Sequence, residues 1–126
     1  MLDIQAFIKE IKSRVPATYY PNLFPAKGAN NCVVVSLSPV LSSRGDIKTF
    51  DVVFYIRAEN TQSCMDIGKK LIETLDYETK LVVNGVQVVL ITATDTIPVF
   101  QGKDANNLYI YRVNLKMLVD IPIVRK

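Results

Sequence analysis

An alternation that places apolar side chains at every second position of two segments constrains the fold of this chain most. In Thr49–Ala58 the even-numbered positions are apolar, and in Leu108–Val119 the odd-numbered positions are apolar. Successive side chains of a strand point to opposite faces, so each segment predicts a strand with one apolar face. A sheet built from such strands needs a second layer over that face.

Two amphipathic segments supply the predicted second layer. Apolar residues recur three or four positions apart from Asp3 to Val15, which predicts a helix that Pro16 ends. A second helix is expected to begin at a cap of Asn60 or Thr61 and to extend through Leu75. We therefore predict an α+β fold, in which a mainly antiparallel β-sheet has two α-helices packed on one face.

Turn residues divide the C-terminal half into hairpins. Asn84 and Gly85 lie between two β-branched runs, and this dipeptide predicts a two-residue type I′ turn. The strand after this turn is expected to continue to about Val99. A final hairpin is then expected to turn through Gln101–Asn107 into the strand Leu108–Val119.

The N-terminal half combines a strand, a loop and an arm. Cys32–Ser38 predicts a strand that Pro39 ends, and Ser42–Asp46 predicts a loop. The segment 16–31 contains three prolines and four large apolar side chains, so we expect an extended, partly buried arm instead of a linker. At this length we expect one domain, residues 1–126, with the proline-rich arm inside it.

The composition argues against catalysis. The chain has no His, and its two cysteines, Cys32 and Cys64, are far apart in the sequence. Without imidazole there is no Ser-His-Asp or Cys-His unit and no His-ligated zinc, and two cysteines cannot complete a cysteine-only zinc site. The isolated glycines form no phosphate-binding loop. We therefore expect no enzyme, no catalytic residue, no metal and no cofactor, and we interpret both cysteines as core residues.

Export and membrane insertion are not expected either. The N-terminal Met1–Ile4 carries an acid where a signal peptide would carry lysines, and the apolar run Val52–Ile56 is far too short to cross a bilayer. The net charge of +3 includes no block of like charges, whereas a dedicated nucleic-acid domain usually shows a stronger and more clustered excess.

A small nucleic-acid-binding module nevertheless stays open as an alternative. One face of the predicted sheet carries side chains that could stack on bases and pair with phosphates: Tyr55, Arg57, Arg112 and Lys116. Asp51 lies on the same face and would oppose a phosphate backbone. The competing interpretation is a sheet face covered by water or by another subunit.

The order of segments along the chain forms a further pattern. An amphipathic helix precedes the strand Thr49–Ala58, which ends near an Arg; a second helix follows. Pro98–Asp104 then places a Pro before a Gly-x-Asp loop, and this loop leads into the alternating aromatic strand Tyr109–Leu115. Together these segments resemble the tail terminator (tail completion or minor capsid) proteins of long-tailed bacteriophages. The resemblance covers most of the chain and includes no catalytic motif.

The resemblance implies a structural protein of virion assembly. Such a protein forms a homo-hexameric ring that caps the tail tube, stops its polymerisation and provides the head–tail joining surface. The implied partners are other copies of the chain, the tail tube protein and the head connector or stopper protein, with DNA only in transit and no membrane. The implied location is the virion, at the interface of head and tail, after assembly in the host cytoplasm. A head-closure or neck component of the same assembly is an alternative that shares the fold.

Candidate contact residues follow from their position in the pattern. The end of the first alternating strand and the loop of the final hairpin are expected to contact other subunits or the tube. The candidates in these two segments are Arg57, Gln101, Lys103, Asp104 and Asn106, and a second group consists of Arg44, Asp46 and Lys48.

Overall fold

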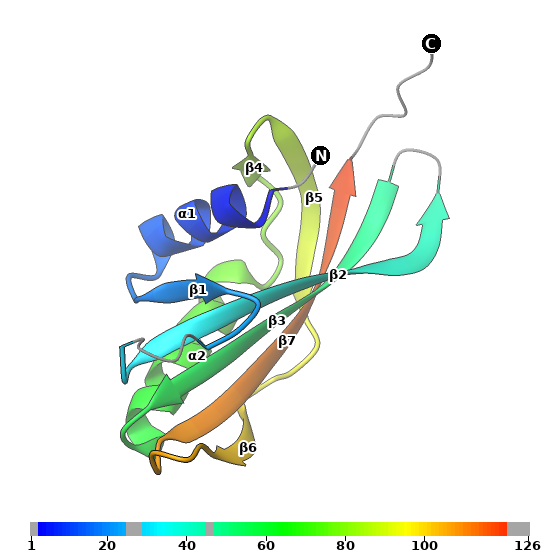
Figure 1. Cartoon of the computed structure of the whole chain (residues 1–126). Coiled ribbons are helices and arrows are strands. Elements are labelled where there is room, and N and C mark those ends of the chain that lie inside the picture. The colour runs from blue at the N-terminus through cyan, green and yellow to red at the C-terminus, as the bar shows by residue number, and fades with distance from the viewer. Residues whose placement is uncertain (1–2, 25–28, 45–46, 121–126) are drawn as a thin grey trace.

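A seven-stranded sheet forms the centre of the computed structural model, which describes residues 3–24, 29–44 and 47–120. Six strands follow the order β1-β2-β3-β7-β5-β4, and β6 also pairs with β7 (Figure 1). The pairing of β1 with β2 is parallel, and the other strand pairs of the described residues are antiparallel. The strands are β1 (Tyr19–Pro21), β2 (Cys32–Arg44), β3 (Ile47–Ala58), β4 (Val82–Val83), β5 (Val86–Ala93), β6 (Val99–Lys103) and β7 (Tyr109–Asp120).

Both helices begin at residues whose side chains cap them. The Oδ1 atom of Asp3 accepts a hydrogen bond from the backbone N of Gln5 at 2.9 Å before α1 (Ile4–Arg14). The Oδ1 atom of Asn60 accepts one from the backbone N of Ser63 at 2.8 Å before α2 (Thr61–Leu75). The two helices pack against the same face of the sheet (Figure 1). The predicted α+β fold is thereby confirmed.

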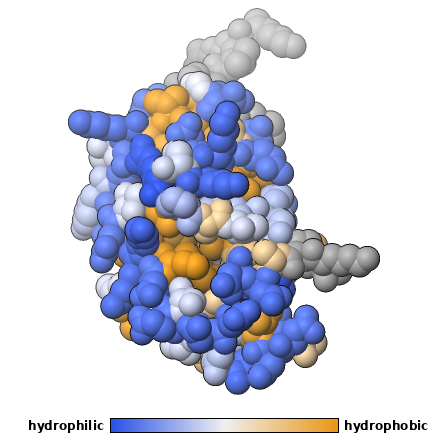
Figure 2. Space-filling view, turned by 90° about the vertical axis from the view of Figure 1, so that its left-hand side faces the viewer, coloured by the Kyte–Doolittle hydropathy of each residue, from blue (hydrophilic) through white to orange (hydrophobic). Residues whose placement is uncertain are grey.

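The core lies between the helices and the apolar faces of β3 and β7. Phe7 of α1 stacks on Phe54 of β3 with ring centroids 6.5 Å apart, and both side chains are fully buried. The predicted alternation is confirmed: seven of the apolar positions are buried, and Phe50, Tyr109 and Tyr111 are half-buried against the core. The buried ones are Val52, Phe54, Ile56, Val113, Leu115, Met117 and Val119. Seen from the helical side, mostly hydrophilic side chains cover this core, with small apolar patches between them (Figure 2).

Two strands share the far edge of β7. β5 pairs with Leu115–Asp120 and β6 with Tyr109–Arg112. The predicted strand to about Val99 is therefore wrong, because β5 ends at Ala93. At the junction, the backbone N atoms of Thr94 and Asp95 both donate to the carbonyl of Asn114, at 2.9 and 3.2 Å. These bonds turn the chain out of β5 before it re-enters the sheet as β6.

The loop between β5 and β6 also supports α2. A Cβ atom on Gly68 of α2 would lie only 2.3 Å from Cγ of Pro98 in this loop and 3.1 Å from Cδ1 of Ile56 in the sheet. Glycine at this helix position therefore permits a close approach that a larger residue would prevent.

The turns differ in how well the sequence predicted them. Asn84 and Gly85 have φ angles of 50° and 79°, as a type I′ turn requires, and they connect β4 with β5 as predicted. In the final hairpin, however, Gln101–Lys103 belong to β6 instead of the turn.

The N-terminal half contains more strand than the sequence predicted. β2 does not end at Pro39 but continues to Arg44, with a register shift between Pro39 and Ser43. Proline is tolerated here because β1 pairs only with Val33–Val35, so among the described residues Pro39 lies on an edge and beside a bulge. Ser42–Arg44 are thus strand, not loop, and the rest of the predicted loop lies outside the described residues. Within the predicted arm, β1 is a strand that the sequence did not indicate.

Candidate functional site

Arg57 lies at the end of β3, on the sheet face opposite the helices, which is here called the open face. Its cross-strand neighbours are Cys32 of β2 and Ile110 of β7. Only 8% of the residue is exposed, because the arm crosses above it. The guanidinium carbon is 4.6 Å from the ring centroid of Phe24, and Nη2 donates to the carbonyl of Ala29 at 2.8 Å. Arg57 therefore fixes both described ends of the arm segment 24–29 to the sheet.

The same guanidinium reaches the turn between β6 and β7. Nη1 of Arg57 is 3.5 Å from Oδ2 of Asp104, whose side chain is also largely buried. The other oxygen, Oδ1, accepts hydrogen bonds from the backbone N atoms of Asn106 and Leu108, both at 2.9 Å. One carboxylate thus shapes the turn and binds Arg57, so the arm and the turn are held by a common pair of side chains.

The first group of predicted contact residues gathers at this end of the sheet. Gln101 and Lys103 on β6 and Asn106 in the turn are exposed, whereas Arg57 and Asp104 are bonded within the chain. The Nζ atom of Lys103 lies 4.5 Å from the ring centroid of Tyr109. The structure therefore separates these five residues into three that present side chains to solvent and two that position the loops.

The second group lies at the opposite end of the sheet. Lys48 is half-buried on β3 and pairs with Val119 of β7, nine residues along the strand from the Arg57 position. At about 3.3 Å per residue this places the two groups roughly 30 Å apart. Arg44 pairs with Ile47 at the end of β2, and Asp46 lies outside the described residues. The structure does not bring the two groups together.

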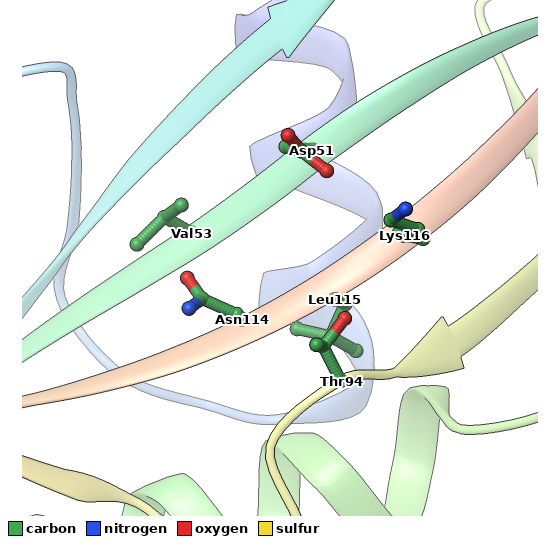
Figure 3. A pocket seen from close by; sticks show the side chains of 6 residues that line it. All are labelled: Asp51, Val53, Thr94, Asn114, Leu115 and Lys116. Atoms are coloured by element: carbon green, nitrogen blue, oxygen red, sulfur yellow. The ribbon is translucent and has the colours of Figure 1, made fainter. Parts of the chain in front are cut away.

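The proposed nucleic-acid residues share the open face, but their charges are largely balanced. Lys116 lies directly across from Asp51, and Nε of Arg112 is 3.8 Å from Oδ2 of Asp95. Asp51 and Lys116 line a pocket of about 180 Å³. Figure 3 shows them on neighbouring strands, with the helices behind the sheet. With Arg57 buried under the arm, Lys116 is the exposed cation of the four predicted residues. This face therefore offers little net positive charge to a phosphate backbone.

An apolar groove lies beside Arg57 and its contacts with Phe24 and Asp104, and the sequence analysis did not predict it. Between the arm and the open face is a cavity of about 300 Å³ with an almost wholly apolar lining, here called the arm groove. Its apolar walls are Leu23, Phe24, Val34, Tyr55 and Ile110, and its polar rim is Asn22 and Gln101. The large apolar content of the arm was the available signal, but nothing local in the sequence showed which sheet face the arm would cover.

The edge of β6 that no described strand pairs with is a second feature that the sequence analysis missed. Ile97, Val99 and Phe100 are 56%, 36% and 53% exposed, and Leu23 at the arm groove is 79% exposed. Phe100 packs against Tyr111 with ring centroids 5.4 Å apart. Exposed apolar side chains that gather at a sheet edge are typical of protein contact surfaces.

The cysteines are buried, as predicted. Burial raises the pKa of the Cys64 thiol to about 11, which disfavours the thiolate that a nucleophile needs. Burial also raises the pKa of Cys32, although the Arg57 guanidinium beside it acts in the opposite direction. Over the described residues, no cluster of three potential metal ligands occurs, and no helix is long and apolar enough to cross a membrane.

Comparison with known proteins now adds to this geometry. Residues 7–121 match a family model described as bacteriophage tail terminator protein. No curated protein matches the sequence. Among solved structures, a chain from the virion of the native gene transfer agent particle has a similar fold, with a TM-score of 0.64 at 11% sequence identity. The similarity covers 93% of this chain and 90% of that chain. Because the family model spans nearly the whole sequence, the chain belongs to the bacteriophage tail terminator family.

Proposed function

We propose that this protein forms a homo-hexameric ring that caps the tail tube, stops its polymerisation and provides the head–tail joining surface. The match of residues 7–121 to the tail terminator family carries this proposal. The chain is a structural component of the virion and acts in tail assembly. Closure into a ring and the identity of each contact are the steps proposed here.

The distribution of free edges and apolar side chains supports assembly into a ring. A closed ring of identical subunits uses heterologous contacts, in which one surface of a copy meets a different surface of the next. The described sheet offers such different surfaces. At one side, β1 pairs with only three residues of β2; at the other, β6 presents exposed apolar side chains.

The proposed contact residues fall into two classes. Gln101, Lys103 and Asn106 are exposed beside the β6 edge and would contact the next subunit or the tube directly. Arg57 and Asp104 would act through the position that they give to the arm and the turn. Arg44 and Lys48, at the far end of the sheet, are proposed to contact a different partner, and Asp46, outside the described residues, is proposed with them. The tail tube protein and the head connector or stopper protein are the two partners considered.

Passage of DNA through such a ring places a limit on its charge. A strongly basic inner surface would bind phosphates and slow the DNA. The cross-strand pair of Asp51 with Lys116, and Asp95 beside Arg112, balance the charges of the open face. This balance gives no support to the nucleic-acid-binding alternative.

The proposal is tested by measuring mass in solution. Light scattering after size exclusion would be recorded for the protein alone and mixed with purified tail tube protein, across a range of salt. A ring-sized species, formed alone or only with tube ends, is the expected result. A monomer that ignores the tube but binds DNA at low salt would refute the proposal, and binding to the head connector without binding to the tube would favour a head-closure role.

A pair of charge-reversal variants locates the contact. Lys103→Glu alters the exposed end of β6, and Lys70→Glu makes the same change at an exposed position of α2. If the β6 end meets the next subunit or the tube, Lys103→Glu weakens assembly at least tenfold while Lys70→Glu leaves it unchanged. Equal effects of the two variants would contradict this location.

A further inference from the structure

The arm groove is an apolar cavity without an occupant among the described residues. Its volume of about 300 Å³ lies at the lower end of the range of protein binding pockets, roughly 300–1,000 Å³. Leu23 stands at its border with most of its side chain in solvent. An apolar cavity of this kind gains free energy when an apolar side chain enters it. An occupant of the arm groove must therefore be an apolar segment.

The sequence contains one apolar segment beyond the described strands. After Asp120, the last residue of β7, it reads Ile121-Pro122-Ile123-Val124 and carries no charge over these four positions. Proline disfavours the helical conformation of the residue before it, and β-branched residues favour extended backbone. These four residues therefore suit an extended peptide that inserts branched aliphatic side chains into a groove on a sheet.

This segment cannot reach the arm groove of its own chain. The groove contains Tyr55, which pairs with Arg112 of β7, eight residues before Asp120. Eight residues of strand separate the two points by about 26 Å. Four extended residues span at most about 14 Å. Figure 1 shows that β7 ends at the opposite end of the sheet from β6.

We infer that residues 121–124 of one copy occupy the arm groove of a neighbouring copy. The contact is heterologous, because a segment after β7 meets a groove at the other end of the next subunit's sheet. Repetition of a heterologous contact closes a ring when the rotation permits. The inference deepens the proposed function and rests on it, because it names the surface by which one ring subunit would hold the next.

A competing site lies nearer on the same chain. Val82 of β4 is 46% exposed and lies in the same cross-strand row as Asp120, through Gln87 of β5. Two strand spacings place it about 10 Å from Asp120, within reach of the segment. It is a single exposed side chain on a two-residue strand, whereas the arm groove has five apolar walls. The experiment must therefore separate these two sites.

Cysteine cross-linking between copies distinguishes the arm groove of a neighbouring copy from Val82 of the same chain. Ile123→Cys and Leu23→Cys would be introduced in separate full-length proteins, mixed with or without tail tube protein, and mildly oxidised. Native Cys32 and Cys64 are buried, and the unsubstituted protein reports their background. Lys69→Cys, at an exposed position of α2, replaces Leu23→Cys as the matched control. We expect the Ile123→Cys and Leu23→Cys proteins to link at least ten times faster than the control pair.

The outcomes distinguish this inference from the proposed ring, because mass is measured on the same samples. A ring that forms without the link overturns the inference and leaves the proposed function intact. A link without a ring supports the contact and counts against the ring. If the double variant Ile123→Cys with Val82→Cys instead links within one molecule at high dilution, the segment stays on its own chain and the inference is overturned.

Discussion

The two faces of β3 and β7 carry equally regular side-chain patterns but are covered by different means. The apolar face lies under two helices whose own apolar stripes match it, and it buries Phe54 completely. The open face is covered at one end by an arm that Arg57 holds through the ring of Phe24 and the carbonyl of Ala29, while the carboxylate of Asp104 binds Arg57 from the turn between β6 and β7. Burial on the first face is broad and hydrophobic, whereas on the second it depends on a few polar contacts.

Truncation of the core face should have the largest effect. Phe54→Ala removes a fully buried ring that stacks on Phe7, and we expect it to lower the free energy of unfolding by about 3–5 kcal/mol. Val53→Ala, on the adjacent open face, removes a half-buried side chain and should cost about 1 kcal/mol. Urea unfolding of both variants provides the measurement. Equal losses would mean that the open face is also buried in the protein in solution.

Removal of the Arg57 side chain tests how the arm is held. Arg57→Met keeps much of the apolar stem but loses the contacts to Ala29 and Asp104, and we expect a loss of about 1.5–3 kcal/mol in unfolding free energy. The arm should also open locally, so thiol reagents should label Cys32, beside Arg57, faster than in the parent protein.

Two controls accompany this prediction. Labelling of Cys64, on the buried face of α2, should change less than that of Cys32. Arg112→Met, on the same face but with its ion pair at 3.8 Å and partly exposed, should cost less than about 1 kcal/mol. If Arg57→Met and Arg112→Met behave alike, the arm is held by its apolar residues instead of Arg57.

The two oxygens of Asp104 can be separated by substitution. Asp104→Asn keeps an oxygen for the backbone N atoms of Asn106 and Leu108 but removes the charge that faces the buried guanidinium of Arg57 at 3.5 Å, and we expect it to cost about 1 kcal/mol. Asp104→Ala removes both functions and should cost about 1–2 kcal/mol. Amide hydrogen exchange at Asn106 and Leu108 should increase only in the Ala variant. An increase in both variants would show that the ion pair, and not the turn, orders these amides.

The smallest effect concerns an ion pair on the helical side. A hydrogen bond from the backbone N of Lys80, together with Arg14, holds the pKa of Glu78 below its usual value. Because the folded pKa is lowered, the stabilisation is present above the unfolded pKa of about 4.3 and is lost as the pH falls through the folded pKa. Glu78→Gln should therefore be less stable than the parent at pH 7 by under about 1 kcal/mol.

Denaturant unfolding at several pH values measures this difference. It should shrink as the pH is lowered from 7 to below about 4, because the parent then also loses the ionised carboxylate. A constant difference over this range would assign the effect to the shape of the side chain and not to its charge.

Local periodicity predicted the parts of the fold whose causes are local. The alternation around Phe54 and the spacing of the helices depend on neighbours in sequence, and both are confirmed. Asn84-Gly85 is also local, because the backbone of two residues determines the turn. The predicted end of a strand was wrong where residues distant in the sequence determine it. β5 ends at Ala93 because Asn114 binds the chain that follows, and no pattern near Ala93 indicates this bond.

The same reasoning explains what the sequence revealed of the candidate site. Arg57 and Asp104 were selected by their positions in a family-like pattern, but their contact joins residues 47 positions apart. The arm groove requires the arm, β2, β3 and β7 to meet, and such a meeting leaves no local periodicity. The exposed β6 edge was missed because Val99 and Phe100 have the composition of any buried strand. The interface roles of Arg57 and Asp104 remain predictions.

The position of β7 at the end of the described chain affects how the protein folds during its synthesis on the ribosome. β7 pairs with β3, β5 and β6, and all three precede it in the chain. One edge of β3 therefore has no partner strand until Tyr109–Asp120 has been made, although β2 already pairs with its other edge. Pairings so distant in sequence form slowly, and unpaired apolar strands are prone to aggregate. Until β7 emerges from the ribosome, the edges of β3 and β5 that it pairs with are open to pairing with other chains.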